Sequence, residues 1–190
     1  MSLKLDFHFN FDRSLQASAY LLKQAEKQEL AYIHLLKMLY IADREYLSER
    51  GYMITGDKVV AMQKGPVLSR ILDLIKGKGR QAKMWHRFIK HSLKKYYVQL
   101  IRDPGDGDLS RASMAKLDDV FMRFGSMKSF QVVRLTHDFS EWENHYTHGT
   151  STHIPWQSIL QAQNAEKMIQ VVESQIKLQQ HQQALQRICR

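Results

Sequence analysis

Histidine and carboxylate side chains gather in one late stretch of the chain, where they could hold a metal ion. His137, His145, His148 and His153 lie close in sequence to Asp138, Glu141 and Glu143. Imidazole nitrogens and carboxylate oxygens suit zinc or iron. No two of these histidines have the HxxxH spacing of a helical zinc site, and His145 and His148 fall in a Gly/Thr-containing segment. A metal-dependent enzyme using the His137–His153 region is therefore kept as an alternative, whereas we predict no metal and no other cofactor.

Motifs typical of nucleophilic or nucleotide-dependent enzymes are absent from the sequence. No GxSxG elbow, which would present a reactive serine, is found. The GxxxxGK[ST] phosphate loop and the GxGxxG dinucleotide fingerprint are also missing. We therefore predict a protein that is not an enzyme.

Positive charge is the main compositional feature. The chain has 28 Lys and Arg against 19 Asp and Glu, a formal net charge of +9, and the excess gathers in residues 76–95. Within residues 78–95, Trp85 and Phe88 lie among the cations, and a nucleic-acid surface can use charge for phosphates and rings for stacking. The candidate nucleic-acid residues are Lys78, Arg80, Lys83, Trp85 and Arg87. The favoured interpretation is a solvated connector held by two aromatic side chains, and nucleic-acid binding is the alternative.

Asp43 follows a strongly apolar helical stretch, so its charge must be solvated or paired. The favoured hypothesis is an internal ion pair or cap that ties the helix to the following hairpin, with Lys64 as the candidate partner. The alternative is a polar patch on a binding face. For His137 the favoured hypothesis is also structural: a side chain that caps a helix or forms a hydrogen bond. The alternative is a catalytic base.

Mainly helical elements position these groups. Apolar spacing predicts helices over residues 13–26, 29–50, 110–124, 130–136 and 155–188, and another that begins at Pro66. Asp12 and Ser110 are the expected N-caps, and Gly51 the expected left-handed C-cap. The β-prone runs Tyr52–Met62 and Tyr96–Ile101 predict one small antiparallel sheet, joined by the alternating residues 3–9. The predicted fold class is α+β and mainly helical, with a small hairpin or sheet and a long C-terminal helix.

The length and composition suit a single domain. The chain has 190 residues, of which 44% are hydrophobic. We predict a domain over residues 1–156 and a Gln-rich helical extension over 157–190 that could pair with a second chain. The single cysteine, Cys189, excludes an intrachain disulfide. With no signal-peptide pattern and no long apolar run, a cytoplasmic protein without membrane contact is expected.

Two blocks of the sequence resemble the Panacea domain family, also known as SocA-like antitoxins or phage-associated GepA-like proteins. The first block is KMLYIADREYLSERGYMITGDKVVAMQKGPV. Its matching residues are Lys37, Leu39, Tyr40, Ala42, Asp43, Gly51, Ile54, Thr55, Gly56, Asp57, Ala61, Gly65, Pro66 and Val67. The second block comprises Leu117–Val120, Phe124–Gly125, Leu135–His137 and Trp142.

The resemblance implies an antitoxin-like protein of prokaryotic or phage toxin–antitoxin loci. Members of the family are thought to neutralise a cognate toxin by direct protein–protein binding, and one is described as an adaptor that delivers its toxin to a protease. We expect the exposed polar residues of the central motif to bind the partner. These candidates are Asp43, Arg44, Thr55, Asp57 and Lys64.

Overall fold

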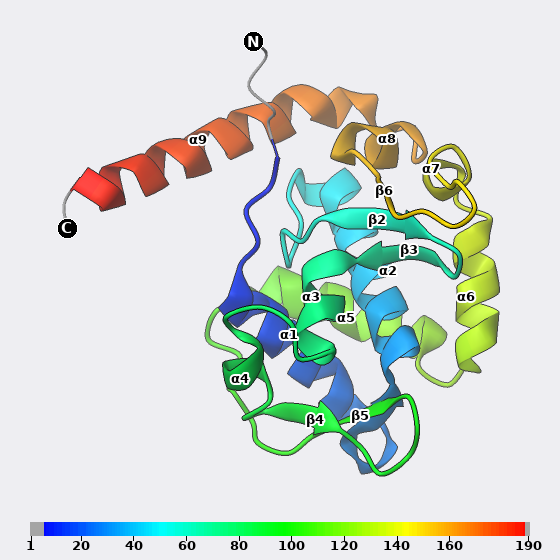
Figure 1. Cartoon of the computed structure of the whole chain (residues 1–190). Helices are drawn as coiled ribbons and strands as arrows, with labels where there is room; N and C mark the ends of the chain where they lie inside the picture. The colour runs from blue at the N-terminus through cyan, green and yellow to red at the C-terminus, as the bar shows by residue number, and fades with distance from the viewer. Residues whose placement is uncertain (1–5, 189–190) are drawn as a thin grey trace.

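Helix α2 (Tyr32–Arg50) runs through the middle of the molecule, and the other elements pack around it (Figure 1). The computed structural model describes residues 6–188, and the side chains of residues 6–178, 180 and 181. Apolar residues on several sides of α2 are buried, as its wide apolar stripe predicted. The helix ends at Gly51, whose φ of 77° and amide bond to the Leu47 carbonyl make the predicted left-handed C-cap.

The remaining helices surround α2 and confirm the mainly helical α+β class. They are α1 (Phe11–Gln24), α3 (Ser69–Ile75), α4 (Ala82–Trp85), α5 (Arg111–Phe124), α6 (Ser129–His137), α7 (Ser140–Glu143), α8 (Trp156–Gln161) and α9 (Ile169–Ile188), with 3₁₀ turns at Glu26–Gln28 and Glu166–Met168. Ser110 caps α5 as predicted, because its hydroxyl accepts the Ser113 amide. Asn10 rather than Asp12 caps α1, because the helix begins two residues earlier than its apolar spacing suggested.

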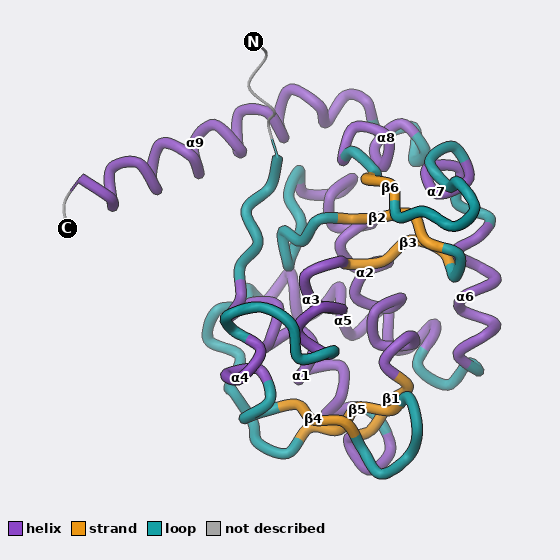
Figure 2. The backbone as a smooth tube through the Cα atoms, in the orientation of Figure 1, coloured by secondary structure: helices purple, strands orange, loops and turns teal. Residues whose placement is uncertain are grey.

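Two antiparallel sheets lie towards opposite ends of the molecule (Figure 2). One has the order β1-β5-β4, formed by Glu29–Ala31, Tyr97–Leu100 and Ile89–His91. The other has the order β3-β2-β6, formed by Gly65–Leu68, Val59–Met62 and Thr152–His153. The prediction of one shared sheet is therefore wrong, because strands of two to four residues are too short to show which runs pair. Residues 6–10 belong to no strand, and residues 3–5 lie outside the described part of the chain.

The Gly65–Pro66 corner also differs from its prediction. Pro66 lies in β3, paired with Ala61 of β2, and the next helix starts only at Ser69. This strand can accept a proline because it is an edge of its sheet.

The C-terminal region is two helices rather than one. Asn164, with a φ of 52°, breaks the helical path between α8 and α9. α8 buries Ile159 and Leu160, and α9 buries Val172 and Ile176 before it extends away from the body (Figure 1). The boundary at residue 156 and the pairing of α9 with a second chain stay predictions. Among the residues described, no helix combines the length and apolar character needed to cross a bilayer.

Candidate functional site: a buried polar corner at the β2–β3 turn

Asp43 lies fully buried on α2 and binds Thr55 rather than Lys64. Its carboxylate accepts the Thr55 amide at 3.0 Å and also the Thr55 hydroxyl. Burial raises the Asp43 pKa to about 7, against the opposing effect of these two donors. The predicted ion pair with Lys64 is wrong, because Lys64 is exposed in the β2–β3 turn. The predicted tie between the helix and the following segment exists, but hydrogen bonds make it.

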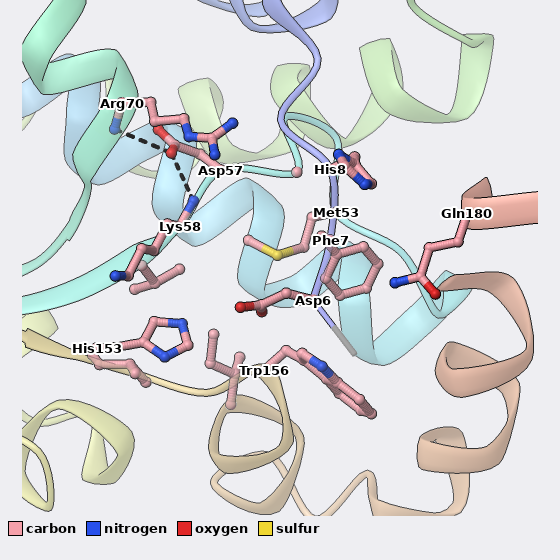
Figure 3. A pocket seen from close by; sticks show the side chains of 14 residues that line it. Asp6, Phe7, His8, Met53, Asp57, Lys58, Arg70, His153, Trp156 and Gln180 are labelled. Carbon is pink, nitrogen blue, oxygen red and sulfur yellow. Dashed lines mark hydrogen bonds between the residues drawn. The ribbon is translucent and has the colours of Figure 1, made fainter. Parts of the chain in front are cut away.

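Asp57, two residues beyond Thr55, holds the start of α3. Its carboxylate accepts the amides of Lys58 at 2.6 Å and Arg70 at 3.1 Å (Figure 3). It also accepts the Ile71 amide at 2.9 Å. The amides of Arg70 and Ile71 belong to the first turn of α3, which has no capping side chain at its own N-cap. Asp57 therefore caps that helix from a distance, and its charge suits the positive end of the helix dipole. Burial raises the Asp57 pKa to about 6, opposed by these amides.

Lys37 is buried on α2 and reaches the Gly65–Pro66 corner. Its ammonium nitrogen donates to the Pro66 carbonyl at 2.6 Å. Burial lowers the Lys37 pKa to about 7. Gly65 has a φ of 88°, and a Cβ at this position would lie 2.7 Å from both Lys37 Nζ and Thr136 Oγ1. Only glycine lets the strand pass this close to the lysine and to α6.

Three stacked rings fix α6 and α7 to the end of β2. His137 stacks on Trp142 with ring centroids 4.3 Å apart, and Trp142 stacks on Tyr146 at 4.8 Å. The Trp142 indole nitrogen donates to the Met62 carbonyl at 2.9 Å. Burial and the neighbouring Lys37 lower the His137 pKa. These contacts favour the neutral form of the imidazole and hold its ring in the packing between α6 and α7.

A second buried polar group links α7 to α2. The Glu141 carboxylate accepts the Tyr40 hydroxyl at 2.7 Å and Arg44 Nε at 2.5 Å. The Arg44 guanidinium also lies 4.1 Å from the centre of the Phe139 ring. Because Glu141 is buried, its charge needs both partners, and removing either would leave it incompletely compensated.

The five predicted partner-binding residues therefore occupy different environments. Asp43, Thr55 and Asp57 are buried, so the expectation that they are exposed is wrong. Arg44 is half-buried and engaged by Glu141. Lys64 alone of the five is exposed.

Other residues of this corner were matched to the family blocks but given no role from sequence. They are Lys37, Tyr40, Gly65, Thr136 and Trp142. Glu141, from outside those matches, was considered only as a carboxylate near the late histidines. Only Lys37 could have been assigned a role from the sequence. It lies within an apolar helical stripe, and a buried cation requires a polar partner.

The four late histidines do not share a ligand set. His137 stacks in the corner, His145 Nδ1 lies 2.9 Å from the Glu141 carbonyl, and His153 is in β6. Within residues 6–188, no group of three His, Cys, Asp or Glu side chains is arranged to hold a metal ion.

The candidate nucleic-acid residues separate by burial. Trp85 is fully buried and packs edge-on against Phe11, so it is not available to stack on bases. Lys78, Arg80, Lys83 and Arg87 are exposed.

A cavity of about 260 Å³ opens beside the Gly56–Asp57 turn (Figure 3). The N-terminal segment closes one side, because the His8 carbonyl oxygen lies only 2.3 Å from where a Cβ on Gly56 would be. Asp6, His8, Lys58 and Arg70 contribute charged or titratable groups to its lining. Both signs of charge are present, so the lining selects no single class of ligand.

Together these contacts define a mainly helical α+β domain in which buried polar groups from distant segments hold a strand corner against two helices. The family model described as "Antitoxin SocA-like, Panacea domain" matches residues 35–143, more than half of the chain. The protein belongs to this family, as the sequence resemblance indicated. No curated protein and no solved structure gives a significant match. Family membership supports a role related to toxin–antitoxin systems and implies, in general terms, a toxin partner.

The buried Lys37 predicts a stability that increases with pH above neutrality. Its pKa is about 7 in the folded protein and near its ordinary 10.5 when unfolded, so the unfolded chain binds more protons between these values. We expect the free energy of unfolding to rise by about 1 kcal/mol per pH unit between about pH 7.5 and 9. Urea denaturation across this range measures the slope, and Lys37→Met should remove it. Equal slopes in both proteins would contradict the assignment.

Proposed function

We propose that this protein neutralises a cognate toxin by direct protein–protein binding and catalyses no reaction itself. The observation that carries the proposal is the family match, which covers the segments that build the buried corner. In that corner, buried charged side chains form hydrogen bonds with backbone groups. Asp43 binds Thr55, Asp57 binds the start of α3, and Lys37 binds Pro66. Such contacts suit a rigid binding surface.

We place the toxin contact on the surface around the β2–β3 turn. Lys64 projects from this turn, and the turn is held by contacts on both of its strands. Met62 accepts the Trp142 indole N–H, and Pro66 accepts Lys37. A surface whose backbone is already fixed loses less conformational entropy when it binds. In this proposal Asp43, Thr55 and Asp57 support binding indirectly, because their buried hydrogen bonds hold the backbone of this region in place. Arg44 supports it by anchoring α7 through Glu141.

Co-expression with the product of the adjacent gene tests the function. That product should be toxic alone, harmless with this protein present, and recovered in a complex with it. A product that is harmless alone, or that stays lethal and unbound, would overturn the proposal. Loss of the toxin over time only when an active protease is present would extend the proposal to an adaptor role.

Reversing the charge of Lys64 tests the proposed surface. We expect Lys64→Glu to weaken toxin binding at least about tenfold, because a rim charge of the wrong sign opposes the partner. Its melting temperature should be unchanged, since Lys64 is exposed and has no ion pair within the described residues. Titration calorimetry with the purified partner measures the change. Lys167→Glu, an equal charge reversal at an exposed site in the turn before α9, is the control and should bind normally. Normal binding by Lys64→Glu would place the contact elsewhere.

A further inference from the structure

The entire net charge of the protein resides in one continuous segment. Residues 76–102, called the basic end below, contain nine Lys and Arg and no Asp or Glu, whereas the formal net charge of the whole chain is +9. The rest of the chain is therefore neutral in formal charge. The nine cations are Lys76, Lys78, Arg80, Lys83, Arg87, Lys90, Lys94, Lys95 and Arg102.

These cations face solvent without acidic partners. All nine are exposed, and none forms an ion pair within the part of the chain that the structure describes. The ion pairs that are present join Lys23, Arg44, Lys116 and Arg123 to carboxylates elsewhere. A concentration of unneutralised charge of one sign attracts a polyanion and accelerates its association.

The basic end forms the part of the molecule around α4, β4 and β5, away from the sheet that contains the β2–β3 turn (Figure 1). β4 and β5 are antiparallel neighbours connected by residues 92–96, and β1 pairs with the other edge of β5 to complete the three-stranded sheet. At the tip of this connection, Leu93 is 108% exposed and Tyr96 is 60% exposed. Lys94 and Lys95 lie over the rings of Tyr97 and Tyr96, at 3.6 and 5.0 Å from the ring centres. The tip therefore combines cations with an uncovered leucine and a partly exposed tyrosine ring.

We propose that the basic end binds duplex DNA, with the 92–96 connection between β4 and β5 entering a groove and the surrounding lysines contacting phosphates. The wide major groove of B-form DNA can admit the connection at the end of a strand pair, whereas the corresponding groove of duplex RNA is deep and narrow. Six of the nine cations are lysines, which are depleted at protein–protein interfaces but contact phosphates readily. Leu93 and Tyr96 contact the groove, and Trp85 remains in the core.

Fluorescence anisotropy with a labelled duplex about two helical turns long tests the proposal directly. The wild-type protein should bind at about 50 mM salt and lose affinity steeply by about 200 mM, as phosphate contacts require. The double variant Lys94→Gln/Lys95→Gln should bind about tenfold more weakly at the lower salt. Its slope of log affinity against log salt should be shallower by about 2, because each phosphate contact contributes about 0.9.

The matched control is Lys167→Gln/Lys177→Gln. It removes the same amount of charge from exposed positions in the turn before α9 and on α9 itself. It should bind the duplex like the wild type, and circular dichroism should show both double variants folded.

Absence of binding at low salt, or binding insensitive to salt, would overturn the proposal. So would equal weakening by the two double variants, since that would reflect net charge alone. Tighter binding to the matching single strand or to an RNA duplex would exclude groove docking on DNA. Tighter binding to phosphatidylserine vesicles, with the same dependence on Lys94 and Lys95, would assign the basic end to a membrane surface. None of these outcomes depends on whether the protein neutralises a toxin.

Discussion

Gly65→Ala is expected to lower the free energy of unfolding by about 3 kcal/mol. About 1 kcal/mol comes from placing a Cβ on left-handed backbone, since the φ of this residue is 88°. The remaining 2 kcal/mol or so comes from overpacking, because the new Cβ would lie 2.7 Å from Lys37 Nζ and Thr136 Oγ1. Neither atom can move freely: Lys37 is hydrogen-bonded to Pro66, and Thr136 to the Val133 carbonyl.

Gly79 provides a matched control for this substitution. Its φ is 87°, almost that of Gly65, but no atom lies within 4 Å of where its Cβ would be. Gly79→Ala should therefore show only the backbone cost of about 1 kcal/mol. Urea denaturation of both variants separates strain from packing. Equal losses of stability would mean that the approach of Lys37 and Thr136 to Gly65 has no energetic consequence.

Asp43→Ala is expected to lower the free energy of unfolding by about 3 kcal/mol. The substitution leaves the Thr55 amide and hydroxyl without their acceptor in a fully buried site, and each unpaired group costs about 1–3 kcal/mol. For a chain of this length the melting temperature should fall by about 10 °C. Differential scanning calorimetry measures the shift.

Asparagine at position 43 separates the loss of charge from the loss of hydrogen bonds. Asp43→Asn keeps the shape of the side chain, an acceptor for the Thr55 amide and a donor towards the Thr55 hydroxyl. It should therefore lose only about 1 kcal/mol. If Asp43→Ala has normal stability and lacks toxin neutralisation, the assignment of Asp43 to internal support is wrong, and the residue contacts the partner.

These variants also separate stability from binding in the neutralisation assay. Gly65→Ala and Asp43→Ala should lose function only at temperatures where they unfold, because both act through the buried corner. Lys64→Glu should lose function while fully folded. A common melting temperature for all three would show that the corner does not support the fold as its contacts indicate.

Sequence pattern alone determined the features that depend on neighbouring residues. The apolar stripe of α2, its end at Gly51 and the Ser110 cap follow from local spacing and backbone geometry. The positive charge of residues 76–95 was equally predictable, because net charge follows from residue types alone and does not depend on which residues are in contact. The two family blocks were recognised for the same reason, since their spacing is a property of the chain itself.

Only the tertiary structure decided which residues meet. The strand over Tyr97–Leu100 pairs with Glu29–Ala31 and Ile89–His91, and strands this short carry no periodic signal for their partners. Asp43 was expected to pair with Lys64, but a buried carboxylate is satisfied equally by nearby backbone and hydroxyl donors. Glu141 lies about a hundred residues beyond Tyr40 in sequence, yet accepts its hydroxyl. Burial and pairing of polar groups depend on segments that local sequence does not bring together, and for that reason the corner emerged only in the folded chain.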